Sequence, residues 1–392
     1  MRNSLKKIGL ISLVLIFSTT GLYAQPINVG FAGITFTGDF KDQRNALSEY
    51  GNSLLTEHER LKNYNKMLSE IASIKNANYN VTMANLDSSS GEAYILAVGI
   101  DYEQLEIREI PQKEEIINSV VTRVYAQIMV FDFINKKLIK SYPVILSIKD
   151  VIEGVVSKDK TSALFNEIYT KELPQKLQSF LQNQEAAFQR PAFSLKLRGL
   201  NLGKHAIKAL DKHGVDADVF KNKTASMFAA NIATVHEVPI IPFSKGRAIG
   251  KMSLRLANND AQSFQLPEGD YLLDIEIIGL KEKVLKETEL EIGVTYISAA
   301  KLTLYDTFKN NKVIFNVRLQ SGVPVIYPKE IYAKLEIWEE LDKSLIFLAQ
   351  DFSTSLKNTE IDYLKKVVKG ENSTKEKQAQ FAKMNTIMRN LK

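Results

Sequence analysis

The sequence contains no cysteine in its 392 residues. Disulfides, zinc–thiolate sites, thiol nucleophiles and lipid attachment to an N-terminal cysteine are therefore excluded, and the fold depends on its apolar core. Histidine is rare, with four residues, and the sequence lacks a Gly-x-Ser-x-Gly nucleophile elbow and a Gly-x-x-x-x-Gly-Lys phosphate loop. We accordingly predict no catalytic residue, no cofactor-binding residue and no metal ligand.

Apolar runs long enough to cross a membrane are absent as well. The longest apolar run, at residues 8–17, follows Arg2, Lys6 and Lys7 and precedes small and polar residues up to Ala24. This order is typical of a bacterial secretory signal, and the run is shorter than the roughly 20 residues that a membrane helix needs. We predict a signal peptide at residues 1–24 that is cleaved after Ala24, with retention as an anchor as the alternative.

Little positive charge remains once this signal is removed. The whole chain carries a formal net charge of +6, and loss of the three cations in the signal leaves +3. A mildly basic chain gives no support to nucleic-acid binding. With 45% hydrophobic residues, the roughly 368 remaining residues can form two or three domains.

Residues 25–190 are predicted to form an N-terminal α/β domain. A strand over 27–40 is followed by leucines spaced seven residues apart, which predict one long helix over 42–73. The leucine stripe can lie on a sheet, the commoner case, or form a coiled coil that makes the protein a homo-oligomer. Three further strands, at 94–110, 120–133 and 138–148, predict an antiparallel meander.

A helix over 161–189, interrupted at Pro174, and the linker that ends at Pro191 close this domain. Residues 191–329 are predicted to be a second, strand-rich α/β domain in which helices at 205–213 and 224–237 precede most of the strands. The order of elements resembles that of the first half, although no aligned sequence repeat is found. A strand that spans 284–304 is among the predictions.

Residues 330–392 are predicted to be a C-terminal helical segment that holds the single tryptophan, Trp338. Its charged end, from residue 369, is predicted to be a solvated helix or a disordered tail. The fold class is therefore α+β, or α/β, with two lobes that each have a largely antiparallel sheet covered by helices.

A possible metal site involves two of the histidines. His205 and His213 flank a predicted helix, and Asp211, Asp216 and Asp218 lie nearby. The histidines are eight residues apart, whereas a four-residue spacing would place two imidazoles on one helical face. Polar residues at a helix terminus are the favoured interpretation.

Two further segments could hold a ligand but have a simpler structural interpretation. The basic loop at residues 244–247 could hold a phosphate or a carboxylate, but two loop cations are usually solvated. Gly30 and Gly33 lie in the first predicted strand, where they indicate close packing or a bulge and not a dinucleotide site.

Asp101 and Glu103 alternate along a predicted strand. Both carboxylates would then lie on one side of the strand about 7 Å apart, a separation that could suit glycoside hydrolysis. The aromatic residues that line a glycosidase cleft are missing nearby, so a solvated strand end is favoured. The same interpretation applies to Asp270, Asp274 and Glu276.

The first half resembles the TolB N-terminal and CsgG-like periplasmic α/β domains. In these domains a strand that ends near a glycine precedes one that ends in an aspartate and a turn, and Val98-Gly99 and Phe131-Asp132 occupy those places. The resemblance covers residues 27–189 and implies an envelope-associated α/β domain. Because the lipidated cysteine is missing and the turn at 134–137 differs, no pore formation is implied and no functional residue is carried over.

Together these features predict a non-enzymatic protein that is periplasmic or secreted, with association with the outer membrane left open. Its predicted role is an interaction or assembly factor in cell-envelope or secretion processes, whose strand edges and long helix contact a protein partner. The alternative is a cell-wall or carbohydrate-directed hydrolase or binding protein that uses Asp101 and Glu103.

Overall fold

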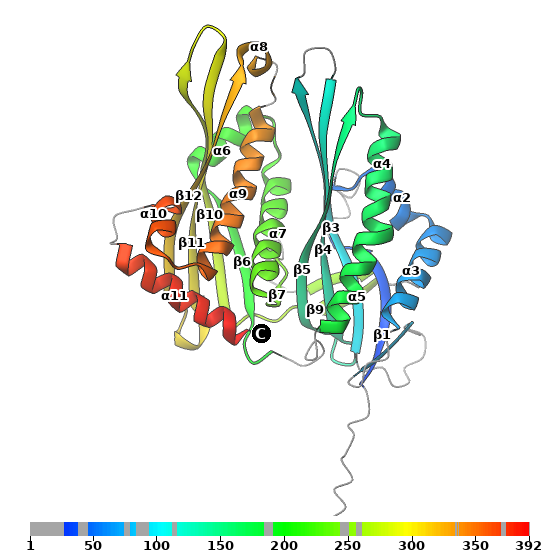
Figure 1. Cartoon of the computed structure of the whole chain (residues 1–392). Coiled ribbons are helices and arrows are strands. Elements are labelled where there is room, and N and C mark those ends of the chain that lie inside the picture. Colours follow the sequence, from blue (N-terminus) through cyan, green and yellow to red (C-terminus); the bar gives the residue numbers. More distant parts are fainter. Residues whose placement is uncertain are drawn as a thin grey trace, which may run out of the picture.

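The chain folds into two lobes, each a mixed sheet with helices, as predicted (Figure 1). The computed structural model describes residues 27–37, 46–73, 79–83, 94–111, 116–183, 191–243, 251–255, 261–333, 335, 337–369 and 374–391. The predicted signal peptide and the basic loop at 244–247 lie outside these residues. In the part that is described, no helix is both long and apolar enough to cross a membrane.

The first sheet has the strand order β2-β1-β3-β4-β5-β9-β8. Its strands are β1 (Ile27–Phe36), β2 (Tyr79–Met83), β3 (Tyr94–Pro111), β4 (Ile116–Asp132), β5 (Lys137–Glu153), β8 (Lys251–Arg255) and β9 (Ala261–Gln265). Strands β3, β4 and β5 form an antiparallel meander, which confirms that prediction. Strands β8 and β9 come from the second half of the sequence, so the first sheet includes residues beyond 190. The division of the chain into domains at residue 190 stays a prediction.

The second sheet has the strand order β13-β12-β11-β10-β6-β7. Its strands are β6 (Leu195–Leu202), β7 (Ile240–Ile241), β10 (Tyr271–Glu287), β11 (Glu291–Asp306), β12 (Lys312–Pro328) and β13 (Val368–Lys369). The strand predicted over 284–304 is instead divided by a turn, in which the Thr288 N–H donates to the Glu291 carbonyl over 2.9 Å.

The two lobes repeat one topology. In each, a first strand pairs in parallel with a short strand and with the first strand of an antiparallel meander. Both meanders have a bulge at the same place, after Ile100 in β3 and after Ile277 in β10. The first strands also end alike, since the N–H groups of Thr37 and Gly203 donate to the carbonyls of Ile100 and Ile277, each over 2.8 Å. The sequence showed a similar order of elements in the two halves, but neither an aligned repeat nor the shared strand pairing.

The helix predicted over 42–73 is two helices, α2 (Glu49–Thr56) and α3 (His58–Ala72), because Glu57 has an extended backbone. The side chains of Leu54 and Leu68 are fully buried in the core of the first lobe. The leucine stripe therefore lies on the sheet, and the coiled-coil basis for a homo-oligomer is lost.

The second helical cover of the first sheet contains the predicted interruption. It consists of α4 (Lys158–Glu167), a π-helical turn (Ile168–Glu172) and α5 (Leu173–Asn183). Pro174 has no N–H to donate to the preceding turn, so the helix widens just before it. In β1, Gly33 has φ of +87° at a register shift and lies against Asn65, which confirms the predicted bulge.

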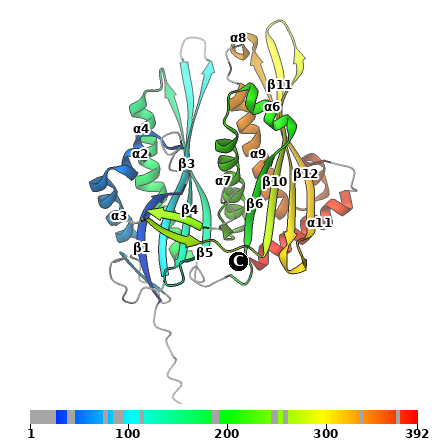
Figure 2. The same cartoon turned by 180° about the vertical axis from the view of Figure 1, so that it is seen from behind.

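Helix α7 (Ala217–His236) lies between the two sheets, as Figures 1 and 2 show. It packs on β5 of the first sheet and on β6 of the second. Eleven of its residues are buried, on all sides of the helix, as expected of a helix that is covered by two layers. One apolar cluster contains Phe228 of α7 together with Tyr102 and Tyr125 of the first sheet, so the core is continuous across the lobes.

The remaining helices belong to the second lobe: α6 (Lys204–Lys212), α8 (Lys329–Tyr332), α9 (Ile337–Lys357), α10 (Ile361–Val367) and α11 (Thr374–Asn390). The predicted C-terminal helix is present as α11, whereas the alternative of a disordered tail was wrong for residues 374–391, and one face of the helix is buried and not solvated. Phe381, Met384 and Leu391 are fully buried in the core of the second lobe, because they are spaced three to seven residues apart on one face of α11.

Candidate functional site

Asp101 and Glu103, which the sequence placed on one side of a strand, lie on opposite faces of the first sheet. The register of β3 against β4 shifts between Ile100 and Tyr102, so Asp101 is the extra residue of a bulge. A bulge re-aims the side chains that follow it. The two carboxylates therefore do not form a glycosidase pair.

The Asp101 carboxylate faces α7 and is bound by uncharged donors. Gln127 Nε2 donates to both oxygens over 2.9 Å, and the Thr37 hydroxyl also donates to it. Burial raises the pKa of Asp101, against the opposing effect of its hydrogen bonds with Thr37, Gln127 and Ser226. The interpretation as a solvated strand end was wrong here, because the carboxylate is a hydrogen-bonded part of the contact between the lobes.

Glu103 faces the helices on the other side of the sheet. Its carboxylate accepts from the Ser48 N–H over 2.5 Å and from the Tyr169 hydroxyl over 2.6 Å. Burial raises the pKa of Glu103, and its hydrogen bonds with Ser48 and Tyr169 only partly offset this effect. Glu103 joins β3 to α2 and to the π-helical turn, and it was also wrongly interpreted as solvated.

Replacing Glu103 with glutamine should change how stability depends on pH. A raised pKa means that the folded state holds the proton more tightly than the unfolded state, so wild type loses stability as pH rises above the ordinary glutamate range. The variant does not titrate at this position. From low pH to a pH above the raised pKa, the free energy of unfolding of the variant should therefore rise relative to that of wild type. The rise should be about 1.4 kcal/mol for each unit by which the pKa of Glu103 is raised.

Urea unfolding between pH 4 and pH 7 measures this difference. The control is Glu109→Gln, which removes an exposed carboxylate from the same strand and should leave the profile of wild type unchanged. A gap between E103Q and wild type that is constant over the whole pH range would contradict the expectation.

The residues weighed as a possible metal site lie at helix ends, which is the interpretation that the sequence favoured. Asp216 is the N-cap of α7, where its carboxylate accepts from the N–H groups of Asp218 and Val219. His213 caps the end of α6 beside the ring of Trp338, and burial lowers its pKa. Among the described residues there is no group of three or more side chains that could hold a metal ion.

The three acidic residues near the start of β10 are not all solvated. The Asp270 carboxylate accepts from both the N–H and the hydroxyl of Ser194, each over 2.8 Å. Asp274 forms an ion pair with Arg198 on the outer face of the second sheet. Asp270 thus fixes the chain where it enters the second lobe.

Ionisable side chains do gather where the first sheet meets the second lobe. Glu106 of β3 binds Arg123 Nη1 over 2.9 Å and Lys343 Nζ over 3.2 Å. Asp342 of α9 binds Lys223 Nζ of α7 over 2.6 Å and accepts from Gln104 Nε2 of β3 over 2.9 Å. These pairs are satisfied within the chain, so they join the lobes and leave no free group for chemistry.

Charge pairing also sets the acidity of Glu106. Burial alone would raise its pKa, but the hydrogen bond from Arg123 and the charge of Lys343 hold the pKa below its usual value. Glu106 is therefore held as a structural anion, whereas burial raises the pKa of Asp101 and of Glu103.

Two strand extensions stand out because their outer edges lack a described strand partner. β3 pairs with no described strand on its outer edge beyond the pairing of Phe36 with Ile100, and β10 pairs with none beyond Ile277, where α6 packs against it. We call residues 102–111, 116–124 and 146–155 the first arm, and residues 280–298 with 321–328 the second arm. Both arms extend from the same end of the molecule (Figures 1 and 2).

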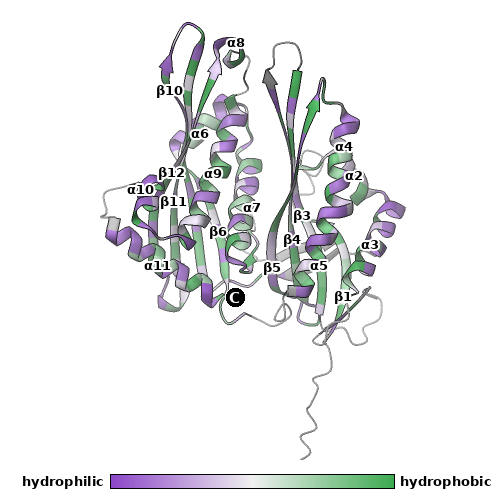
Figure 3. Ribbon diagram, in the orientation of Figure 1, coloured by the Kyte–Doolittle hydropathy of each residue, from purple (hydrophilic) through white to green (hydrophobic). Residues whose placement is uncertain are grey.

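Exposed apolar side chains are concentrated on these arms. Of the fourteen large apolar side chains that are exposed among the described residues, eight lie there: Leu105, Ile116, Val151, Val155, Val284, Leu285, Leu290 and Ile326. Leu290 is 80% exposed and Val155 is 88% exposed. Figure 3 shows apolar segments, in green, near the ends of the first arm. Open strand edges also offer N–H and C=O groups to a further strand.

Comparisons with known proteins do not assign the chain to a family. No known family matches it, and no curated protein matches it. A neuraminyllactose-binding hemagglutinin homolog from Helicobacter pylori is 15% identical, with 42% of this chain and 86% of that chain covered and a TM-score of 0.30. A minor lipoprotein from Acinetobacter baumannii is 10% identical, with 40% and 94% covered and a TM-score of 0.21. At these TM-scores the likenesses carry no argument about fold or function.

Sequence reasoning missed the arms as a site. The strands themselves were predicted, but the helices that cover them end before the strands do, and only the structure shows where. One available signal was the length of β3, β4, β10 and β12, which at 17 or 18 residues are far longer than ordinary strands.

Proposed function

We propose that the protein is a non-enzymatic, exported binding protein of the cell envelope, and that it engages a protein partner with its two arms. The observation that carries the proposal is the concentration of exposed apolar side chains on the arms. Export rests on the signal pattern of the first 24 residues. The resemblance to TolB-like and CsgG-like domains is in keeping with an envelope role.

The arms suit a partner that presents an extended, alternately apolar segment. An added strand gains main-chain hydrogen bonds from an open edge, and apolar side chains on one face supply the affinity. Charged residues such as Lys149 and Lys283 interrupt the apolar surface, and these keep two copies from pairing edge to edge. The repeated topology places one such arm on each lobe, so the partner is held at two points.

A photo-crosslinking amino acid at Val151 or at Leu285 tests this proposal in cells that export the protein. Both positions are 58% exposed, one on each arm. We expect both to give an adduct with the same partner. Matched controls are Ile134 and Phe308, which are exposed in the turns at the opposite ends of the two meanders and should give none.

A charge at the second arm should weaken the complex. With Val151 as the crosslinking position, Leu285→Glu should reduce the adduct at least about tenfold, which corresponds to about 1.4 kcal/mol. Circular dichroism checks that the variant is folded. Equal adducts at the arms and at the control positions, or no protein adduct at Val151 and Leu285, would overturn the proposal.

A further inference from the structure

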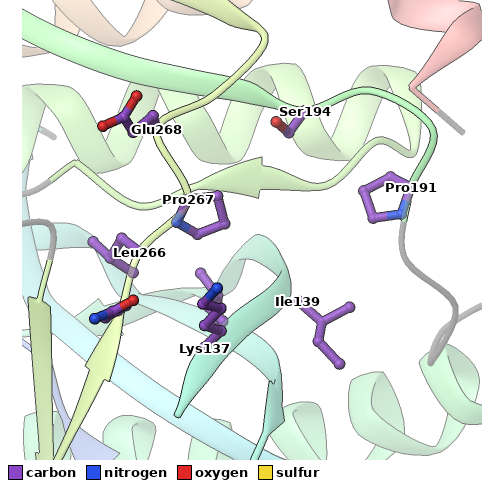
Figure 4. Close-up of a pocket in the computed structure, with 9 residues that line it drawn as sticks. Lys137, Ile139, Pro191, Ser194, Leu266, Pro267 and Glu268 are labelled. Atoms are coloured by element: carbon purple, nitrogen blue, oxygen red, sulfur yellow. The ribbon is translucent and has the colours of Figure 1, made fainter. Parts of the chain in front are cut away.

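A cavity of about 400 Å³ lies at the place where the chain crosses between the lobes. Its floor is the start of β5, and its walls are the two crossing segments, residues 191–194 and 265–268. In Figure 4, Lys137 and Ile139 of β5 lie on one side of the space, and Pro191 and Pro267 lie on the other. Volumes of this size hold small ligands, and such sites occur preferentially where domains meet.

The walls are apolar and largely preformed. Leu138, Ile139 and Leu266 are buried, with at most 7% of each exposed, and two prolines complete the lining. The prolines restrict the backbone of the crossing segments. Asp270 further fixes the first crossing by its two hydrogen bonds with Ser194. A ligand that enters would therefore meet an aliphatic surface that costs little to organise.

Among the described lining residues, Lys137 is the only cation and Glu268 the only anion. Glu268 lies close enough to Lys196 for its charge to raise the pKa of that lysine, against the larger effect of desolvation. Lys196 Nζ also donates to the Pro267 carbonyl over 3.3 Å, so Lys196 and Glu268 compensate each other at one wall. The exposed ammonium of Lys137 has no hydrogen-bonding or ionic partner among the described residues. The ammonium of Lys137 is therefore available to a ligand at the edge of an apolar space.

We infer that this cavity binds a small monocarboxylate with an aliphatic body, whose carboxylate pairs with Lys137 and whose chain lies against Ile139 and Leu266. The cavity is separate from the arms, so the inference about its ligand does not depend on the proposed function. Two sources share this chemistry: a free medium-chain fatty acid and a peptide whose C-terminal residue is aliphatic.

Isothermal titration calorimetry with octanoate on the full exported chain tests the inference. We expect saturable binding of octanoate, with octanol and octylammonium at least tenfold weaker because neither can pair with the ammonium of Lys137. N-acetyl-alanyl-leucine is the second probe, and whichever of octanoate and this peptide binds more tightly identifies the source.

Two lysine variants complete the test. Lys137→Met should weaken the tighter probe at least tenfold, and Lys137→Arg should restore most of the affinity. Lys149→Met removes an exposed lysine at the far end of the same strand and should have no effect. Failure of both carboxylate probes to bind, or equal binding by wild type and Lys137→Met, would overturn the inference.

Discussion

Replacing Phe228 with alanine is expected to lower the free energy of unfolding by about 3–5 kcal/mol, the usual cost of removing a fully buried phenylalanine. Phe228 lies on α7, has no exposed surface, and its ring centroid is 6.3 Å from that of Phe352 on α9. Since α7 packs on both sheets, the substitution would leave an empty space in the core between the two sheets. Both lobes should therefore lose stability together.

Scanning calorimetry separates this outcome from the alternative of independent lobes. Wild type should melt in one transition, and Phe228→Ala should move that whole transition to lower temperature. Val219→Ala on the first turn of the same helix is the control; Val219 is 41% exposed, so its loss should cost less than about 0.5 kcal/mol. Two transitions, of which only one shifts, would show that the lobes unfold separately.

The strands could be predicted because the physical signal for them is local. Alternating apolar and β-branched residues identified β1 and the meander of β3, β4 and β5, whose observed bounds differ from the predicted ones by a few residues. The leucine spacing likewise identified the apolar face of α2 and α3. What it could not show is the break at Glu57, because this residue has no proline or glycine signal to mark it.

The error at Asp101 and Glu103 has a different cause. Both carboxylates would share one side only if side chains alternated without a break along β3, and one extra residue in the strand reverses every later side chain. The bulge is set by pairing with β4 and by the end of β1 at Thr37. These are contacts between residues distant in sequence, so no pattern within β3 could reveal them.

The shared strand pairing of the two lobes could not be predicted from the sequence for a similar reason. Equivalent positions in the two lobes share backbone roles but not side chains: Tyr102 follows the bulge in β3, whereas Gly279 follows it in β10. Tyr102 is needed because it stacks on Tyr125 and donates to the Lys223 carbonyl of α7. The equivalent residue of the second sheet, Gly279, instead lies against His205 of α6. The two bulges therefore face different elements, α7 in the first lobe and α6 in the second.

The same asymmetry predicts a large effect at Lys223. Lys223→Met should destabilise the protein by about 3–5 kcal/mol, because it leaves the buried carboxylate of Asp342 without its cation. The Asp342 side chain is only 8% exposed, and Gln104 is its other donor among the described contacts. Guanidinium unfolding measures the loss.

A matched control, Lys221, lies two residues before Lys223 on the same helix. Lys221→Met breaks the exposed pair with Asp218, in which the two charged atoms are 3.9 Å apart, and should cost less than about 1 kcal/mol. The double variant Lys223→Met with Asp342→Leu removes both charges and should recover much of the loss, since an apolar pair can replace a buried ion pair. If Lys223→Met costs no more than Lys221→Met, the charges between the lobes behave as surface pairs, and apolar packing around α7 alone holds the two sheets together.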